Sequence, residues 1–211
     1  MSSKRALELI ESEYPINIRS KFYPVIKNAY SAFWELVKRE EMLFWKGGQN
    51  VYGDLINVAV EFFIKNLIDS DLYKYNYTYS IKENKRKNHY HLEIYTKSQT
   101  TKLTISQVDS PITRPRFATF RNRELSNQLM IKEIEDQIII EEAPYNLLLT
   151  HGGNNYDLEF VMLGIPEDKP KGWIEQVDLS KEFAQYVTPE EFKLEEETLV
   201  ALKEVIKNRG V

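Results

Sequence analysis

Residues 75–106, YNYTYSIKENKRKNHYHLEIYTKSQTTKLTIS, decide the fold of this chain. Apolar and polar side chains alternate along 75–82, 89–94 and 102–106, a pattern that is typical of β-strands. The charged stretch 83–88 and the polar stretch 98–100 separate these runs and predict short turns. The pattern therefore predicts an antiparallel meander at about 75–109 with one apolar and one polar face.

The residues before the meander predict helices. Apolar positions recur at helical spacing in a short segment that begins at Ser2-Ser3 and ends at Tyr14-Pro15. A longer helix is predicted from about Ser20 to Phe44, where Gly47-Gly48 stops it, and a third from Asp54 to Ile68. We expect the two longer helices to cover the apolar face of the meander, because each exposes an apolar stripe that must be buried.

The residues after the meander predict further strands and a last helix. Short apolar runs at 138–140, 146–150, 158–163 and 173–179 favour strands, and HGGNN at 151–155 is typical of a hairpin loop. Residues 188–191, TPEE, match a capping box and predict an amphipathic C-terminal helix over 188–210. The expected fold is one α+β domain over 1–211, with a helical part (1–70), a mainly β part (72–187) and the C-terminal helix.

The composition excludes several classes of site. The chain has 211 residues, of which 42% are hydrophobic, enough for a substantial core. Because it has no cysteine, a disulfide framework, a thiolate zinc site, an iron–sulfur cluster and a cysteine nucleophile are all excluded. No apolar run reaches the roughly 18 residues of a membrane span, so no membrane partner is expected. Acidic residues at 8, 11 and 13 argue against a secretory leader and predict a cytoplasmic protein.

The charges are distributed unevenly along the chain. Residues 72–132 hold 12 basic and 4 acidic side chains, whereas residues 133–211 hold 7 basic and 18 acidic ones. Such a basic segment, 82–123, attracts polyanions if it is exposed, and the acidic C-terminal part neutralises it if the two face each other. The sequence leaves these alternatives open.

The basic segment predicts a non-enzymatic, nucleic-acid-binding or nucleic-acid-associated regulatory role, with DNA or RNA as partner and contacts mainly to phosphates. In a meander, the first turn and the exit of the third strand lie at the same end of the sheet, which should gather the basic residues there. Two aromatic side chains within RPRFATFRNR could stack on bases. The predicted contact residues are Lys82, Lys85, Arg86, Lys87, Arg114, Arg116, Phe117, Phe120, Arg121 and Arg123.

Two alternatives remain. The first is a protein-interaction module whose basic and acidic surfaces bind complementary surfaces of another protein. The second is a metal-dependent hydrolase or nuclease on the polar sheet face, since the order of elements is compatible with a restriction-endonuclease-like core. Glu61, Glu93 and Asp109 are the available acids, but the tight acid-x-lysine spacing is missing, because Tyr95 lies two residues after Glu93.

The histidines and glycines give no cofactor site. His89 and His91 share one strand face and could approach one metal, but a third ligand, such as His151, would have to come from elsewhere in the chain. HGGNN is not followed by a predicted helix, so it lacks the backbone amides of a phosphate cradle. We therefore expect no metal and no cofactor, and the sequence identifies no catalytic residue.

Overall fold

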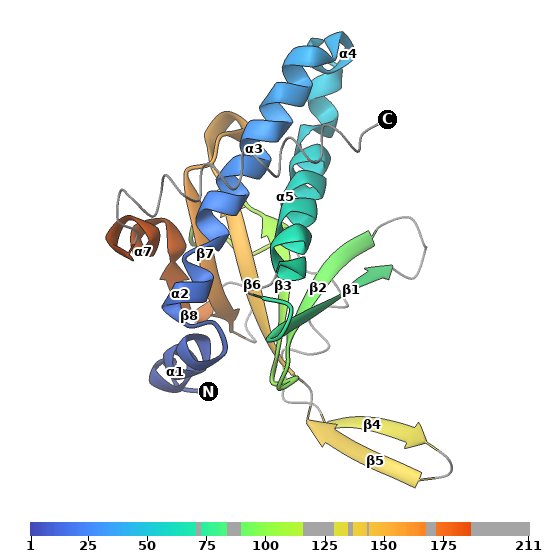
Figure 1. Ribbon diagram of the computed structural model, residues 1–211, viewed down its shortest axis with the longest axis vertical. Coiled ribbons are helices and arrows are strands. Elements are labelled where there is room, and N and C mark those ends of the chain that lie inside the picture. Colours follow the sequence, from blue (N-terminus) through green and yellow to red (C-terminus); the bar gives the residue numbers. More distant parts are fainter. Residues whose placement is uncertain are drawn as a thin grey trace.

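The computed structural model describes residues 1–70, 73–83, 90–115, 129–134, 137–142, 144–167 and 172–186, and it confirms an α+β fold (Figure 1). The helical elements are α1 (Ser3–Glu13), α2 (Ile16–Arg19), α3 (Phe22–Arg39), α4 (Glu41–Phe44), η1 (Gly48–Val51), α5 (Tyr52–Asp69), η2 (Asn154–Tyr156) and α7 (Leu179–Tyr186). The strands are β1 (Tyr77–Glu83), β2 (Tyr90–Thr96), β3 (Thr101–Gln107), β4 (Leu129–Ile134), β5 (Gln137–Glu142), β6 (Tyr145–Gly152), β7 (Phe160–Pro166) and β8 (Trp173–Asp178). The predicted C-terminal helix, 188–210, lies outside the described residues.

The first helices begin and end close to the predicted positions. Ser2 caps α1, because its hydroxyl accepts a hydrogen bond from the backbone N–H of Arg5 at 3.4 Å. The predicted helix over 20–44 is instead divided into α3 and α4, since Glu40 adopts an extended backbone (φ −107°, ψ 100°). The break buries Leu43 and allows the Tyr52 hydroxyl to donate to the Leu43 carbonyl at 2.9 Å.

The main sheet has six strands in the order β1-β2-β3-β6-β7-β8. The predicted meander is present, because β1–β2 and β2–β3 pair antiparallel. The prediction of an antiparallel sheet is wrong at one position, since β3 and β6 pair in parallel. Parallel neighbours need a long crossover, and residues 108–144 provide its length; within them β4 and β5 form a separate two-stranded sheet.

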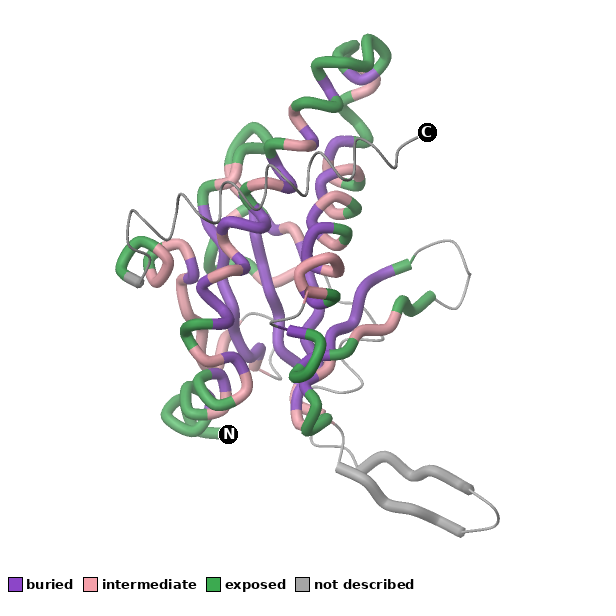
Figure 2. The backbone as a smooth tube through the Cα atoms, in the orientation of Figure 1, coloured by how far each residue is buried: buried purple, intermediate pink, exposed green. Residues whose placement is uncertain are grey.

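The core lies between α3, α5 and one face of the main sheet (Figure 2). Leu103, Leu147 and Leu149 of the central strands are fully buried and belong to the same cluster as Ile56 and Ile64 of α5. This alternation of buried apolar residues is what the sequence pattern predicts for a half-covered sheet. We call this side of the sheet the helix face.

The edge strand β1 departs from the predicted pattern. Tyr77 is buried (4% exposed), but Tyr75 precedes the strand and is 67% exposed, and Ile81 is 61% exposed. Both were predicted to face inward with Tyr77. Tyr75 lies before the strand begins, and Ile81 lies near the end of β1, the edge strand of the sheet.

A buried ion pair attaches α7 to α2. The Arg19 guanidinium donates to both Glu182 carboxylate oxygens, at 2.8 Å and 2.6 Å, and also to the Tyr14 carbonyl at 3.0 Å. Two parallel bonds to one carboxylate give the strongest geometry available to this pair. Helix α7 is therefore held to the N-terminal helices by this ion pair, together with the contact between the Tyr23 and Phe183 rings, whose centroids are 5.4 Å apart.

Replacing Glu182 by Gln should lower the free energy of unfolding by about 2 kcal/mol, because a charge-assisted pair becomes a neutral hydrogen bond at a buried guanidinium. Urea unfolding of the two proteins measures this difference. Glu11→Gln on the exposed side of α1 is the control and should change stability by less than about 0.5 kcal/mol. Equal effects of the two substitutions would contradict the anchoring role of Glu182.

Candidate functional site

The face of the sheet opposite α3 and α5 is polar and buried. We call it the polar face; its members alternate along β2, β3 and β6 with the core residues of the helix face. The sequence predicts a polar surface here, but most of these side chains are less than 10% exposed. The polar face consists of His91, Glu93, Tyr95, Lys102, Thr104, Ser106, Asn146 and Thr150.

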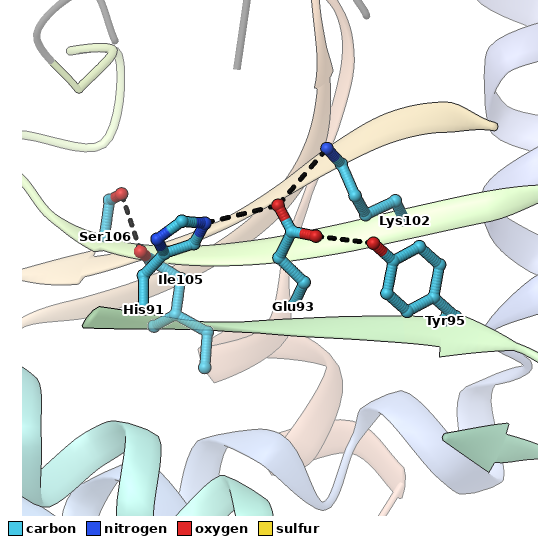
Figure 3. Close-up of polar contacts among 6 residues, drawn as sticks. All are labelled: His91, Glu93, Tyr95, Lys102, Ile105 and Ser106. Atoms are coloured by element: carbon cyan, nitrogen blue, oxygen red, sulfur yellow. Dashed lines mark hydrogen bonds and ion pairs between the residues drawn. The ribbon is translucent and has the colours of Figure 1, made fainter. Parts of the chain in front are cut away.

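Glu93 lies at the centre of the polar face and contacts three side chains (Figure 3). Its Oε1 is 3.2 Å from His91 Nε2 and 3.4 Å from Lys102 Nζ. Its Oε2 accepts a hydrogen bond of 2.5 Å from the Tyr95 hydroxyl. Strand alternation places His91, Glu93 and Tyr95 on one side of β2, and the β2–β3 register brings Lys102 beside them.

The contacts of Glu93 determine its charge. Burial alone would raise the pKa of Glu93, but the hydrogen bonds from His91 and Tyr95 and the charge of Lys102 outweigh burial and lower this pKa to about 2. Burial lowers the pKa of Lys102, and the Glu93 carboxylate opposes that change. Glu93 is thus an anion near neutral pH, and its charge favours the ammonium form of Lys102.

Two threonine hydroxyls of the polar face are buried without a hydrogen-bond partner among the described residues. Thr104 Oγ1 and Thr150 Oγ1 belong to side chains that are 2% and 0% exposed. Thr104 pairs directly with Glu93 across β2–β3, and Thr150 lies on β6, the other neighbour of β3. A buried hydroxyl without a partner costs roughly 1–3 kcal/mol, so two close together suggest that the site takes a polar ligand or water.

The structure separates the histidines that could have shared a metal. His91 contacts Glu93 on the polar face, whereas His151 points to the helix face, where its Nδ1 is 2.9 Å from the Tyr30 hydroxyl. His89 lies outside the described residues. Among the residues that the structure describes, no three His, Asp or Glu side chains are grouped as a metal site would require.

The hydrolase alternative requires an acid and a lysine in contact. Such a pair is present, but its two residues lie on neighbouring strands rather than on one strand. Glu93 and Lys102 are nine residues apart in sequence and 3.4 Å apart in space. Lys102 was not among the predicted site residues, because the acid-x-lysine motif places the lysine two residues after the acid. Strand alternation was the signal that could have found it, since Lys102 is on the polar side of β3. The hydrolase alternative stays a prediction.

Of the ten predicted contact residues, the structure describes Lys82 and Arg114. Lys82 is exposed on β1, opposite His91, near the end of the sheet where β3 leaves it. Arg114 is half-buried and donates to the Glu167 carbonyl at 2.7 Å. The other eight, Lys85, Arg86, Lys87, Arg116, Phe117, Phe120, Arg121 and Arg123, lie outside the described residues.

The predicted gathering of basic residues is wrong for Arg114. Glu167 directly follows β7, and β7 ends where β3 begins, at the opposite end of the sheet from Lys82. The segment that carries Arg114 runs along β8, where the Gln176 side chain donates to the Pro111 carbonyl at 2.9 Å and the Trp173 indole to the Ile112 carbonyl at 3.2 Å. Because of these contacts, residues 111–114 run away from Lys82.

No protein-family model, curated protein or solved structure matches this chain. Within the described part of the chain, none of the helices is both long and apolar enough to cross a bilayer.

Proposed function

We propose that this protein binds nucleic acid without catalysing a reaction on it, through phosphate contacts at the end of the sheet where β1 ends and β2 begins. The observation that supports this proposal is the position of Lys82, exposed at this end and paired in register with His91. The segment between β1 and β2 contains Lys85, Arg86 and Lys87. Four cations within six residues provide the charge that phosphate binding uses.

The arginine-rich stretch belongs to the proposal on sequence grounds alone. β3 ends at Gln107 beside the start of β2, but the described residues that follow it contact β8 and Glu167 and so run away from Lys82. We include Arg116, Arg121 and Arg123, with Phe117 and Phe120 for stacking, in the proposal on sequence grounds. Arg114 is left out because it contacts the Glu167 carbonyl at the other end. The proposed place of action is the cytoplasm.

The test is binding of fluorescently labelled DNA and RNA of unrelated sequence, measured by anisotropy at several salt concentrations. Changing Lys82, Lys85, Arg86 and Lys87 together to Ala should weaken binding at least tenfold at low salt for every sequence. The slope of log K against log salt should fall by about 0.9 for each duplex phosphate contact that is lost. The effect should not depend on sequence, since phosphate contacts carry no sequence information.

A charge-matched control separates this site from general electrostatic attraction. Lys27, Lys38, Arg39 and Lys46 are also four exposed cations, but they lie on α3 and the segment after α4. Changing these four to Ala alters the net charge by the same amount and should leave affinity and salt slope within about twofold of the parent. If both variants weaken binding equally, or if the parent binds neither DNA nor RNA, the proposal is wrong.

A further inference from the structure

The polar face contains buried hydroxyls that the fold itself leaves without partners. Thr104 Oγ1 and Thr150 Oγ1 make no hydrogen bond to any described residue, although both side chains are almost fully buried. Their strands are neighbours, and Thr150 lies two positions beyond Leu148, the partner of Thr104. From ordinary strand spacing and rise, their backbones are roughly 8 Å apart. One tetrahedral oxyanion can accept a hydrogen bond from both hydroxyls over such a span.

The charges beside these hydroxyls favour an anion over a cation. Lys102 is two residues before Thr104 on the same side of β3, and Lys82 lies on the neighbouring part of β1. Lys82 is near enough to contribute to the lowered pKa of Lys102. Glu93 is the one carboxylate among the polar-face residues, so with Lys102 and Lys82 charged the local balance is positive by one. A cation bound here would be repelled by the Lys102 ammonium.

We propose that the polar face binds a phosphate group, which accepts hydrogen bonds from Thr104 and Thr150 and is attracted by the charges of Lys102 and Lys82. Glu93 acts as a positioning residue, because its carboxylate holds Lys102 on this face. The choice of phosphate rests on the proposed function, since nucleic acid presents phosphate beside the same strand that bears Lys82. A 5′-terminal phosphate and free inorganic phosphate share this chemistry.

The first experiment uses inorganic phosphate and the full chain. Phosphate added to a phosphate-free, constant-ionic-strength buffer should raise the melting temperature saturably, by about 5 °C once it is well above its dissociation constant. Thr104→Val with Thr150→Val keeps the side-chain shape and removes both hydroxyls. This double variant should lose the phosphate response and be at least as stable as the parent without phosphate, since no hydrogen bond to a described residue is lost.

Thr96→Val is the matched control. Thr96 is as buried as Thr104, but its hydroxyl lies 3.2 Å from that of Thr101 and 3.0 Å from that of Ser98. Its replacement should therefore lower the melting temperature and leave the phosphate response intact. Absence of a response in the parent, or an equal response in the double variant, would overturn the proposal. So would a double variant that is as destabilised as Thr96→Val, because its hydroxyls would then have protein partners.

The second experiment separates the two sources of phosphate. If a nucleic-acid end supplies the ligand, the double variant should bind a 5′-phosphorylated oligonucleotide at least fivefold more weakly than the parent and an unphosphorylated one equally well. If the double variant differs from the parent only in its response to inorganic phosphate, the site is supported with free phosphate as its ligand. Nucleic-acid binding by a parent that shows no phosphate response would overturn this inference and leave the proposed function in place.

Discussion

Replacing Glu93 by Gln is expected to lower the free energy of unfolding by about 3 kcal/mol, the usual result of removing one partner of a buried ion pair. Lys102 is 2% exposed, so its ammonium cannot turn to water when the carboxylate is lost. The Tyr95 hydroxyl also loses a charged acceptor at 2.5 Å. Lys102→Met should cost a similar amount, because it leaves the Glu93 carboxylate buried without its cation. Urea unfolding at neutral pH gives both values.

The double variant Glu93→Gln/Lys102→Met should recover most of the lost stability, because burying a neutral pair costs less desolvation free energy than burying charges. Its free energy of unfolding should come within about 1 kcal/mol of that of the parent. The resulting coupling energy should exceed about 2 kcal/mol. Lys65 and Asp69 form a shorter pair, at 2.6 Å, but their side chains are 33% and 48% exposed. Their coupling should stay below about 0.5 kcal/mol. Additive losses at Glu93 and Lys102 would show that burial does not strengthen this pair.

The fold class could be predicted because the periodicity of the sequence changes once, from helical spacing before residue 70 to alternation after residue 75. Alternation reports which side chains share a face, and it correctly placed His91 and Glu93 together. The break at Glu40 had no such signal, because residues 38–41, KREE, contain no proline or glycine, and apolar residues resume at Met42 and Leu43. Burial of Leu43 and the hydrogen bond from Tyr52 stabilise the break, and both are tertiary contacts.

The order of the strands could not be read from alternation. A strand shows the same pattern whether its neighbour is parallel or antiparallel, so the parallel pairing of β3 with β6 was not predictable from residues 101–107 and 145–152. The pairing matters for the site, because it brings Asn146 and Thr150 beside Lys102 and Thr104. The sequence had left the order of the strands after residue 128 open.

The burial of the polar face and the contact between Glu93 and Lys102 could not be predicted from the sequence. Alternation predicted that His91 and Glu93 lie on a polar face of the sheet, but it did not predict that this face is buried and that they are 7% and 5% exposed. The approach of Glu93 to Lys102 depends on the register across the turn 97–100, in which Gln99 adopts φ 57°. One residue more or fewer in this turn would place Lys102 on the helix face. Register of this kind is a property of the folded hairpin.

His151 is a second buried group with a large expected effect, and it lies on the helix face, away from Glu93. Its ring is fully buried against Tyr30 of α3, with Nδ1 2.9 Å from the Tyr30 hydroxyl and the rings at 89°. Its Nε2 has no hydrogen-bond partner among the described residues. Burial lowers the pKa of His151 to about 3 from its ordinary value of 6.5. The folded protein therefore holds this imidazole neutral.

Stability should therefore fall as the pH falls below about 6.5, because the unfolded chain then binds a proton at His151 that the folded chain excludes. Between pH 6.5 and pH 5 the loss due to this residue should reach about 2 kcal/mol, at 1.36 kcal/mol for each pH unit. Glu93, whose pKa is lowered to about 2, adds its own loss of stability only below about pH 4.5, so the two effects occur in different pH ranges.

The measurement is urea unfolding at half-unit steps from pH 5 to pH 7.5 for the parent and for His151→Gln. The variant will be less stable overall, because the contact with Tyr30 changes, but its stability should depend on pH by about 2 kcal/mol less over this range. Parallel curves for the two proteins would show that the folded protein accepts the proton at His151, and that its burial against Tyr30 does not hold the ring neutral.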